Sequence, residues 1–265
     1  MTGQAILSII AGLPIGLQLG ATGTGGAILA VPALVYVAGI QPKEAAAMSL
    51  VIVAASAWLG VWECGRLGSV RPKATAAFSG TGIGGSWLGA YGHQMVRGDV
   101  LLILFGLLLL LARYVMARHA VRHRAAEPES GCAIHFPRTC WLKLAGLGLV
   151  VGMLNGFFGV GGGFMIVPAL ALFAGFAQRQ AVGTSLSIIA LISLGGIARH
   201  LEVGALDGAL TALVILGSAA GMLLGTRLGQ RVSPKTMSRV AASVTISLAA
   251  WLILFNTAKL LGVRL

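Results

Sequence analysis

The sequence GLQLGATGTGGAILAVPAL at residues 16–34 returns as GMLNGFFGVGGGFMIVPAL at residues 152–170. The two copies lie 136 positions apart, and five glycines and the closing Val-Pro-Ala-Leu coincide at that spacing. Further along, Gly221 and Gly225 lie 136 positions after Gly85 and Gly89. A repeat of this length within an apolar chain indicates two related halves.

The composition is that of an integral membrane protein. Hydrophobic residues make up 57% of the 265 residues and charged residues only 10%, whereas soluble domains carry about 25% charge. Apolar runs of about 17–25 residues are long enough to cross a bilayer as helices. Runs such as residues 101–111 lack the alternation of barrel strands, so we predict an all-α membrane protein.

Each half is predicted to contain a broken helix or helical hairpin followed by three transmembrane helices. Five glycines between residues 16 and 26 disfavour a continuous helix, because glycine costs about 1 kcal/mol relative to alanine. We therefore predict unwound tips at residues 20–26 and 155–163, and a bend at Pro32. The predicted spans are residues 45–62, 74–95 and 100–116 in the first half, and residues 180–197, 206–225 and 236–255 in the second.

The charged residues predict the domain boundaries and the orientation. Residues 118–139 read as a basic cytoplasmic linker between a first membrane repeat, 1–117, and a second, 140–265. The net charge of +12 is explained by loops on the cytoplasmic side, so no nucleic-acid partner is expected. The basic loop follows the second apolar region in the first half and the third in the second half, which favours an inverted repeat.

The cysteines Cys64, Cys132 and Cys140 are expected to be free thiols, because an odd number without a framework argues against disulfides. Cys132, His135 and Cys140 lie close together, but their spacing is not a usual zinc pattern. We predict neither a metal nor a cofactor.

The two tips predict a site for an anion. Unwound backbone within a membrane is tolerated where its N–H groups line a cavity, and a helix N-terminus adds partial positive charge. Two helices are expected to begin near Gly25 and Gly161, and glycine permits close approach of a ligand to the backbone. The predicted spans contain almost no charged residues, whereas buried Asp or Glu chains mark cation or proton pathways.

The candidate substrate-binding residues lie at the tips and near the start of the span that follows each tip. Gln18 lies close to the first tip, and Ser49 and Ser185 occupy equivalent positions. The alternatives are that the glycines are packing notches and that the hydroxyls bond to their own backbone. His93, Glu63, Arg199 and His200 are further candidates, for proton coupling. The predicted substrate-binding residues are Gly20, Thr22, Gly23, Thr24, Gly25, Gly26, Ser49, Asn155, Gly156, Gly159, Gly161, Gly162, Gly163, Thr184 and Ser185.

The paired motifs resemble the sulfite exporter TauE/SafE family of membrane permeases. The resemblance rests on residues 20–26 with 31–34, residues 156–163 with 167–170, and the run at 181–186, and it covers nearly the whole chain except the linker. It implies transport of small sulfur-containing anions, such as sulfite, thiosulfate or organosulfonates, across the bacterial inner membrane. Ala27 stands where the second copy has Gly163, so the tips are not identical.

We expect a secondary transporter that moves such an anion by alternating access between the two halves. Its expected partners are a small anionic substrate and the lipid bilayer. The alternatives are an anion channel and a non-transporting membrane scaffold. No enzyme is expected, because no paired carboxylates, metal-ligand helix or Ser/His/Asp set stand out. The pattern leaves open the anion, the direction, a coupling proton or ion, and a homo-oligomer.

Overall fold

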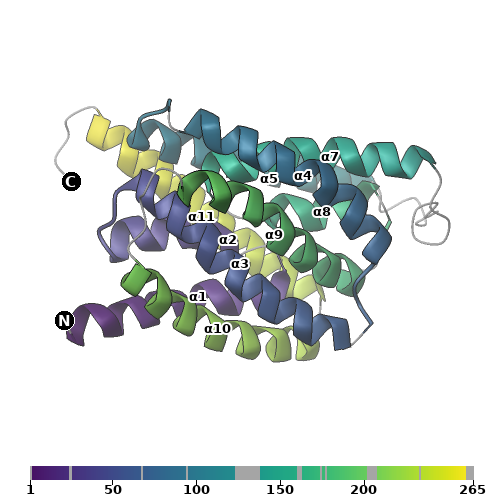
Figure 1. Ribbon diagram of the computed structural model, residues 1–265, viewed down its shortest axis with the longest axis horizontal. Helices are drawn as coiled ribbons and strands as arrows, with labels where there is room; N and C mark the ends of the chain where they lie inside the picture. Colours follow the sequence, from purple (N-terminus) through teal and green to yellow (C-terminus); the bar gives the residue numbers. More distant parts are fainter. Residues whose placement is uncertain are drawn as a thin grey trace.

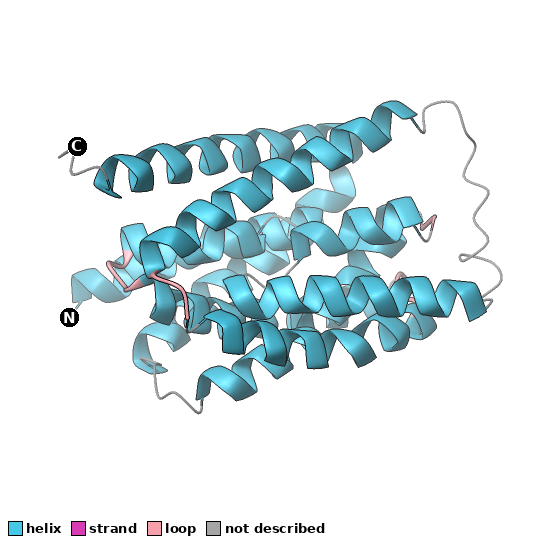
Figure 2. Cartoon of the chain, turned by 90° about the horizontal axis from the view of Figure 1, so that it is seen from above, coloured by secondary structure: helices cyan, strands magenta, loops and turns pink. Residues whose placement is uncertain are grey.

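The computed structural model describes residues 2–23, 26–66, 68–93, 95–122, 138–159, 163–173, 175–176, 178–201, 208–232 and 234–260. All regular structure in these residues is helical (Figure 2), which confirms the predicted all-α membrane fold. The first half contains α1 (Thr2–Thr22), α2 (Gly26–Pro32), the π-helix η1 (Ala33–Val37), α3 (Pro42–Arg66), α4 (Pro72–His93) and α5 (Gly98–Arg122). The second half contains α7 (Arg138–Phe158), α8 (Gly163–Phe173), α9 (Gln178–Leu201), α10 (Gly208–Arg231) and α11 (Pro234–Leu260).

The helix breaks are present but are shorter than the sequence predicts. Residues 20–22 belong to α1 and residues 155–158 belong to α7, so they are helical rather than unwound. They stay helical because Gly20 and Gly156 pack directly on the backbone of a neighbouring helix. The π-helix η1 directly follows Pro32, where the sequence predicts a bend. Below, residues 23–25 are the first break and residues 159–162 the second break.

Among the described residues, five helices are long and apolar enough to cross a membrane: α3, α5, α7, α9 and α10. α4 is 22 residues long, but its many glycine, serine and threonine residues make it less apolar than those five helices. Both helices that flank the predicted linker extend into it, since α5 continues to Arg122 and α7 begins at Arg138. Basic side chains are compatible with helix ends that continue beyond the hydrocarbon region.

The cysteine prediction is confirmed at one position and wrong at another. Cys64 is a free thiol. Cys140, buried near the start of α7, is disulfide-bonded, whereas the odd number of cysteines predicts a free thiol. Cys132 and His135, the other members of the weighed metal cluster, lie outside the described residues.

The two halves exchange helices in their closest packing. Helix α1 of the first half lies along α10 of the second, and α7 of the second half lies along α4 of the first (Figure 1). Both pairs are parallel, because contacts ascend together on both helices: Gly12, Gly16 and Gly20 face Val214, Ser218 and Met222. Glycines let the backbones approach closely, as is typical of helix pairs within membranes.

Helices α4 and α7 also pack in parallel through glycines that contact the backbone of the partner helix. Gly148, Gly152 and Gly156 of α7 pack on the backbone of Phe78, Gly82 and Ser86, in ascending order. These pairs match the α1–α10 pairs when the 136-residue shift is applied, so the same contact is built twice.

Helices α3 and α9 cross the middle of the bundle in opposite directions (Figure 1). Gly60, near the end of α3, lies against Leu186, near the start of α9. Leu50, near the start of α3, lies against Gly196, near the end of α9. Their contacts with α10 and α4 ascend instead, so α3 is parallel to α10 and α9 is parallel to α4.

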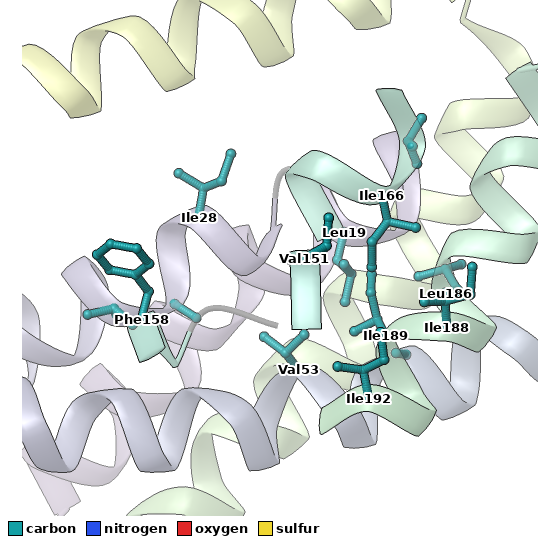
Figure 3. Packing of buried hydrophobic residues seen from close by; sticks show 14 of the residues in the cluster. Leu19, Ile28, Val53, Val151, Phe158, Ile166, Leu186, Ile188, Ile189 and Ile192 are labelled. Carbon is teal, nitrogen blue, oxygen red and sulfur yellow. The ribbon is translucent and has the colours of Figure 1, made fainter. Parts of the chain in front are cut away.

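The buried core lies between the two repeats. Figure 3 shows Leu19 of α1, Val151 of α7, Ile166 of α8 and Ile189 of α9 among the buried hydrophobic residues. These helices come from both halves, so neither half encloses the core alone.

Candidate functional site

The first break begins where α1 ends. Gly23 has φ of +66°, a conformation that glycine adopts readily and other residues rarely do. Its N–H still donates to the carbonyl of Leu19, at 2.8 Å, and completes the last turn of α1. α2 starts at Gly26, which is buried against Ile15 and Leu19 of α1. Thr24 and Gly25 lie outside the described residues.

The second break begins with the same backbone geometry as the first. Gly159 has φ of +69°, and its N–H donates to the carbonyl of Asn155 at 2.9 Å. α8 then starts at the buried Gly163. Gly161 and Gly162 lie outside the described residues.

Each break is supported by the central helix of the other repeat. Ser185 of α9 donates to the carbonyl of Gly23 at 3.2 Å, and also approaches the carbonyl of Val182 at 2.8 Å. Ser49 of α3 donates in the same way to the carbonyls of Gly159 and Ala46. The two sets of residues are related by the 136-residue shift, so the same serine-to-carbonyl hydrogen bond is formed in both halves.

The two serines are therefore engaged with protein carbonyl groups. Both side chains are fully buried, and each hydroxyl hydrogen is directed to the backbone. A serine that donates to the break can still accept a hydrogen bond, but its donor is not available to an anion. The geometry assigns Ser49 and Ser185 to positioning the breaks.

Several other predicted site residues also have contacts within the protein. The Thr22 hydroxyl donates to the Gln18 carbonyl at 2.8 Å, which is common for threonine in membrane helices. The buried Thr184 hydroxyl accepts from the Arg71 backbone N–H at 3.1 Å. Gly20 packs on α10 and Gly156 on α4, and a Cβ atom at either position would collide with a backbone carbonyl. These two glycines serve helix packing.

Two buried amides lie one turn before the breaks. Asn155 is 1% exposed and Gln18 is 9% exposed, and neither the amide nitrogen nor the amide oxygen of either has a hydrogen-bond partner within the described part of the chain. Asn155 is among the predicted site residues, whereas Gln18 is noted in the sequence only for its closeness to the first tip. A signal for Gln18 does exist, because an amide stands there among apolar residues.

The breaks lie at different depths in the bundle. Gly20 and Gly60 both contact Met222, which places the end of α1 near Gly60 of α3. Gly156 and Gly196 both contact Ser86, and Gly196 contacts Leu50, which places the end of α7 near Leu50. From Leu50 to Gly60 is about 15 Å along the axis of α3, at 1.5 Å per residue. The expectation that both tips hold one anion together therefore needs revision.

Sequence reasoning missed two polar contacts between helices. His93 at the end of α4 is 2% exposed, and its Nδ1 lies 2.7 Å from the carbonyl of Phe157, next to the second break. Ser56 of α3 and Ser218 of α10 share a buried hydroxyl–hydroxyl hydrogen bond of 2.8 Å. The spacing of the repeat does not reveal either one, because the equivalent pairs are Gly229 with Ala21 and Ile192 with Gly82.

A multi-pass helical bundle with interrupted helices and a neutral polar interior defines the class of membrane transporters. The family described as sulfite exporter TauE/SafE matches residues 8–252, so the chain belongs to this family. It is a multi-pass bacterial membrane protein of that kind.

Similar proteins carry matching names. A probable membrane transporter protein of Xylella fastidiosa (strain 9a5c) is 32% identical over 260 residues, covering 97% of this chain and 98% of that protein. The probable membrane transporter protein YunE of Bacillus subtilis (strain 168) is 25% identical over 265 residues, covering 94% of this chain and 97% of its own length. No solved structure matches the chain significantly.

Proposed function

We propose that this protein is a secondary transporter that moves a small sulfur-containing anion, such as sulfite, thiosulfate or an organosulfonate, by alternating access. The anion would be held at either helix break by backbone N–H groups and neutral side chains. The observation that supports this most is the glycine break that occurs once in each repeat of this membrane protein. The glycine that begins each break accepts a hydrogen bond from a serine of the other repeat.

The electrostatics of the interior favour an anion held by dipoles. Among the described residues, the buried polar side chains are serine, threonine, glutamine, asparagine and one histidine, with no buried Lys, Arg, Asp or Glu. An uncompensated buried charge is expensive, whereas oriented N–H groups can receive an anion without one. The 11-residue helix α8, which starts directly after the second break, supplies such an N-terminus.

Alternating access also suits the directions of the helices. α3 and α9 occupy equivalent positions in the repeat and are antiparallel, and α1 and α7 run with α3 and α9 respectively. We infer from these directions that the two repeats are inverted. In inverted-repeat transporters, one repeat rocks against the other around a site at their interface.

Transport in proteoliposomes tests the proposal. Purified protein should take up sulfite, thiosulfate or sulfoacetate with saturable kinetics, and unlabelled anion inside the vesicle should accelerate entry of labelled anion. Protein-free liposomes are the control. Unitary conductance steps without counterflow would indicate the channel alternative, and the absence of flux for all three anions would refute the proposal.

A further inference from the structure

The amides of Gln18 and Asn155 are unusual among the buried polar groups of the described residues. Ser79, Ser86 and Ser193 also have a hydroxyl without a partner there, but only these two side chains leave two polar atoms unmatched, an amide nitrogen and an amide oxygen. A buried polar group without a partner destabilises a folded protein, because the water it loses on burial is not replaced. Two such groups call for a ligand that compensates them.

The scaffold itself does not require either amide. At the 136-residue shift, Leu154 occupies the position equivalent to Gln18, and Leu19 occupies the position equivalent to Asn155. Leu19 is fully buried in the core, so the bundle accepts leucine at this place in the first repeat. Each repeat thus has one amide before its break, but the two amides are not at positions related by the 136-residue shift.

The positions of the two amides relate them to the breaks. The backbone carbonyl of Gln18 accepts from Thr22, the last residue of α1, and the backbone carbonyl of Asn155 accepts from Gly159. Both amides therefore belong to the final turns of the interrupted helices. Those helix ends lie near Gly60 and Leu50 of α3. Because α1 runs with α3 and α7 runs against it, each amide lies nearer the middle of the bundle than its helix end, and the amides are separated by about 10 Å in depth.

We propose that Gln18 and Asn155 mark two anion subsites at different depths, where each side-chain N–H₂ donates to an oxygen of the sulfur-containing group and the anion occupies the two in turn. This inference rests on the proposed function. A neutral amide binds an oxyanion without the strong attraction of a Lys or Arg ion pair, so the anion can leave again, as movement between sites requires.

The subsites also have different neighbours on the membrane faces. The first break lies toward the end of the bundle where α3 and α10 end and α4 begins. The helix ends and the connection there carry Arg71, Lys73, Arg227 and Arg231. Basic residues identify that end as cytoplasmic. The Gln18 subsite is thus the one nearer the cytoplasm, and the Asn155 subsite is the one nearer the opposite face.

The test replaces each amide by the leucine of the other repeat, as Gln18→Leu and Asn155→Leu. We expect each variant to unfold at the same temperature as the wild type or a higher one, because an unmatched polar group is removed. We expect KM for sulfoacetate to rise at least tenfold, from the cytoplasmic side for Gln18→Leu and from the opposite side for Asn155→Leu. Oriented proteoliposomes give the two KM values separately.

Two further sets of variants complete the design. Ser79→Ala removes an unmatched buried hydroxyl elsewhere and should leave both KM values unchanged. Gln18→Asn and Asn155→Gln retain an amide, so their KM values should lie between those of the wild type and the leucine variants. If a leucine variant does not fold, the amide variant at the same position is measured in its place. Unchanged KM values in leucine variants of an active transporter would overturn this inference alone. An inactive wild-type protein would overturn the proposed function and this inference together.

Discussion

The first and second breaks have the same backbone support but different polar neighbours. Ser185 holds Gly23 and Ser49 holds Gly159, and these pairs are exact equivalents in the repeat. By contrast, the second break has His93 bonded to Phe157, where the first has only the contact of Gly229 with Ala21. The repeated residues build the geometry twice, while the residues that differ make the polar surroundings of the two breaks distinct.

The crossings of the central helices show the same contrast. Where α3 crosses α10, Ser56 and Ser218 form a buried hydrogen bond. Where α9 crosses α4, Ile192 lies against Gly82. The equivalent helix contacts therefore accommodate either a pair of hydroxyls or a large residue that faces a glycine. Polar groups can differ between the halves while the arrangement of the helices stays the same.

The largest expected effect concerns the parallel helix pairs. In Gly156→Ala the new methyl group would meet the carbonyl of Ser86 on α4, whereas in Gly146→Ala, on the same helix, it would meet no atom within 4 Å. We expect Gly156→Ala to lower the free energy of unfolding by about 3 kcal/mol. Gly146→Ala should raise it by up to about 1 kcal/mol. Reversible unfolding in detergent micelles measures both, and equal stabilities would contradict the tight α4–α7 contact.

A second comparison separates backbone conformation from packing at the breaks. Gly39 has φ of +71° and open space around it, so Gly39→Ala reports the conformational cost alone, about 1 kcal/mol. At Gly23 the added methyl group would lie 2.8 Å from a Val182 side-chain carbon, whereas at Gly159 it would come closer still to Ala46 and would meet that residue's backbone. In both variants the steric clash adds to the conformational cost. We therefore expect the free energy of unfolding to fall by about 2 kcal/mol for Gly23→Ala and by about 3 kcal/mol for Gly159→Ala.

The ranking is the informative result of that series. If Gly159→Ala is no more destabilising than Gly39→Ala in the same unfolding assay, the second break does not pack on α3 as described.

The smallest expected effect concerns the hydroxyl pair that has no counterpart in the other half. Ser56→Ala and Ser218→Ala should each lower the free energy of unfolding by about 1 kcal/mol, because each leaves the other hydroxyl without its partner. The double variant removes both hydroxyls and should lower it by less than the sum of the two single effects. Ser243→Ala removes an exposed hydroxyl and should change it by less than about 0.5 kcal/mol. Strict additivity in a double-mutant cycle would mean that the two hydroxyls do not interact.

Much of the fold follows from composition and from the repeat. The order of the helices and the two breaks occur where the sequence predicts them, and a π-helix follows Pro32, where the sequence predicts a bend. The length of each break was overestimated, because glycine lowers helix propensity whether or not a neighbouring helix packs on it. Gly20 and Gly156 stay helical since α10 and α4 cover them, and nothing in the local sequence identifies those partners.

The candidate site is less accessible to sequence reasoning. The spacing equates Ser49 with Ser185, but it does not reveal that each donates to a glycine carbonyl 110 or 162 positions away. The structure shows that both hydroxyls donate to the breaks, and substrate binding by the two serines stays a prediction. Gln18 and Asn155 acquire their significance from burial without a partner, which is a property of the folded bundle.

By itself, the sequence determined that this chain is helical, lies in a membrane, is built from two related halves and has two glycine interruptions, because these properties depend on local composition and on one fixed spacing. The tertiary structure alone decided which half supports which break, how deep each break lies and which polar side chains remain unmatched. Those features depend on contacts between helices far apart in the chain, where the close approach of two backbones, and not the propensity of either segment, selects the partner.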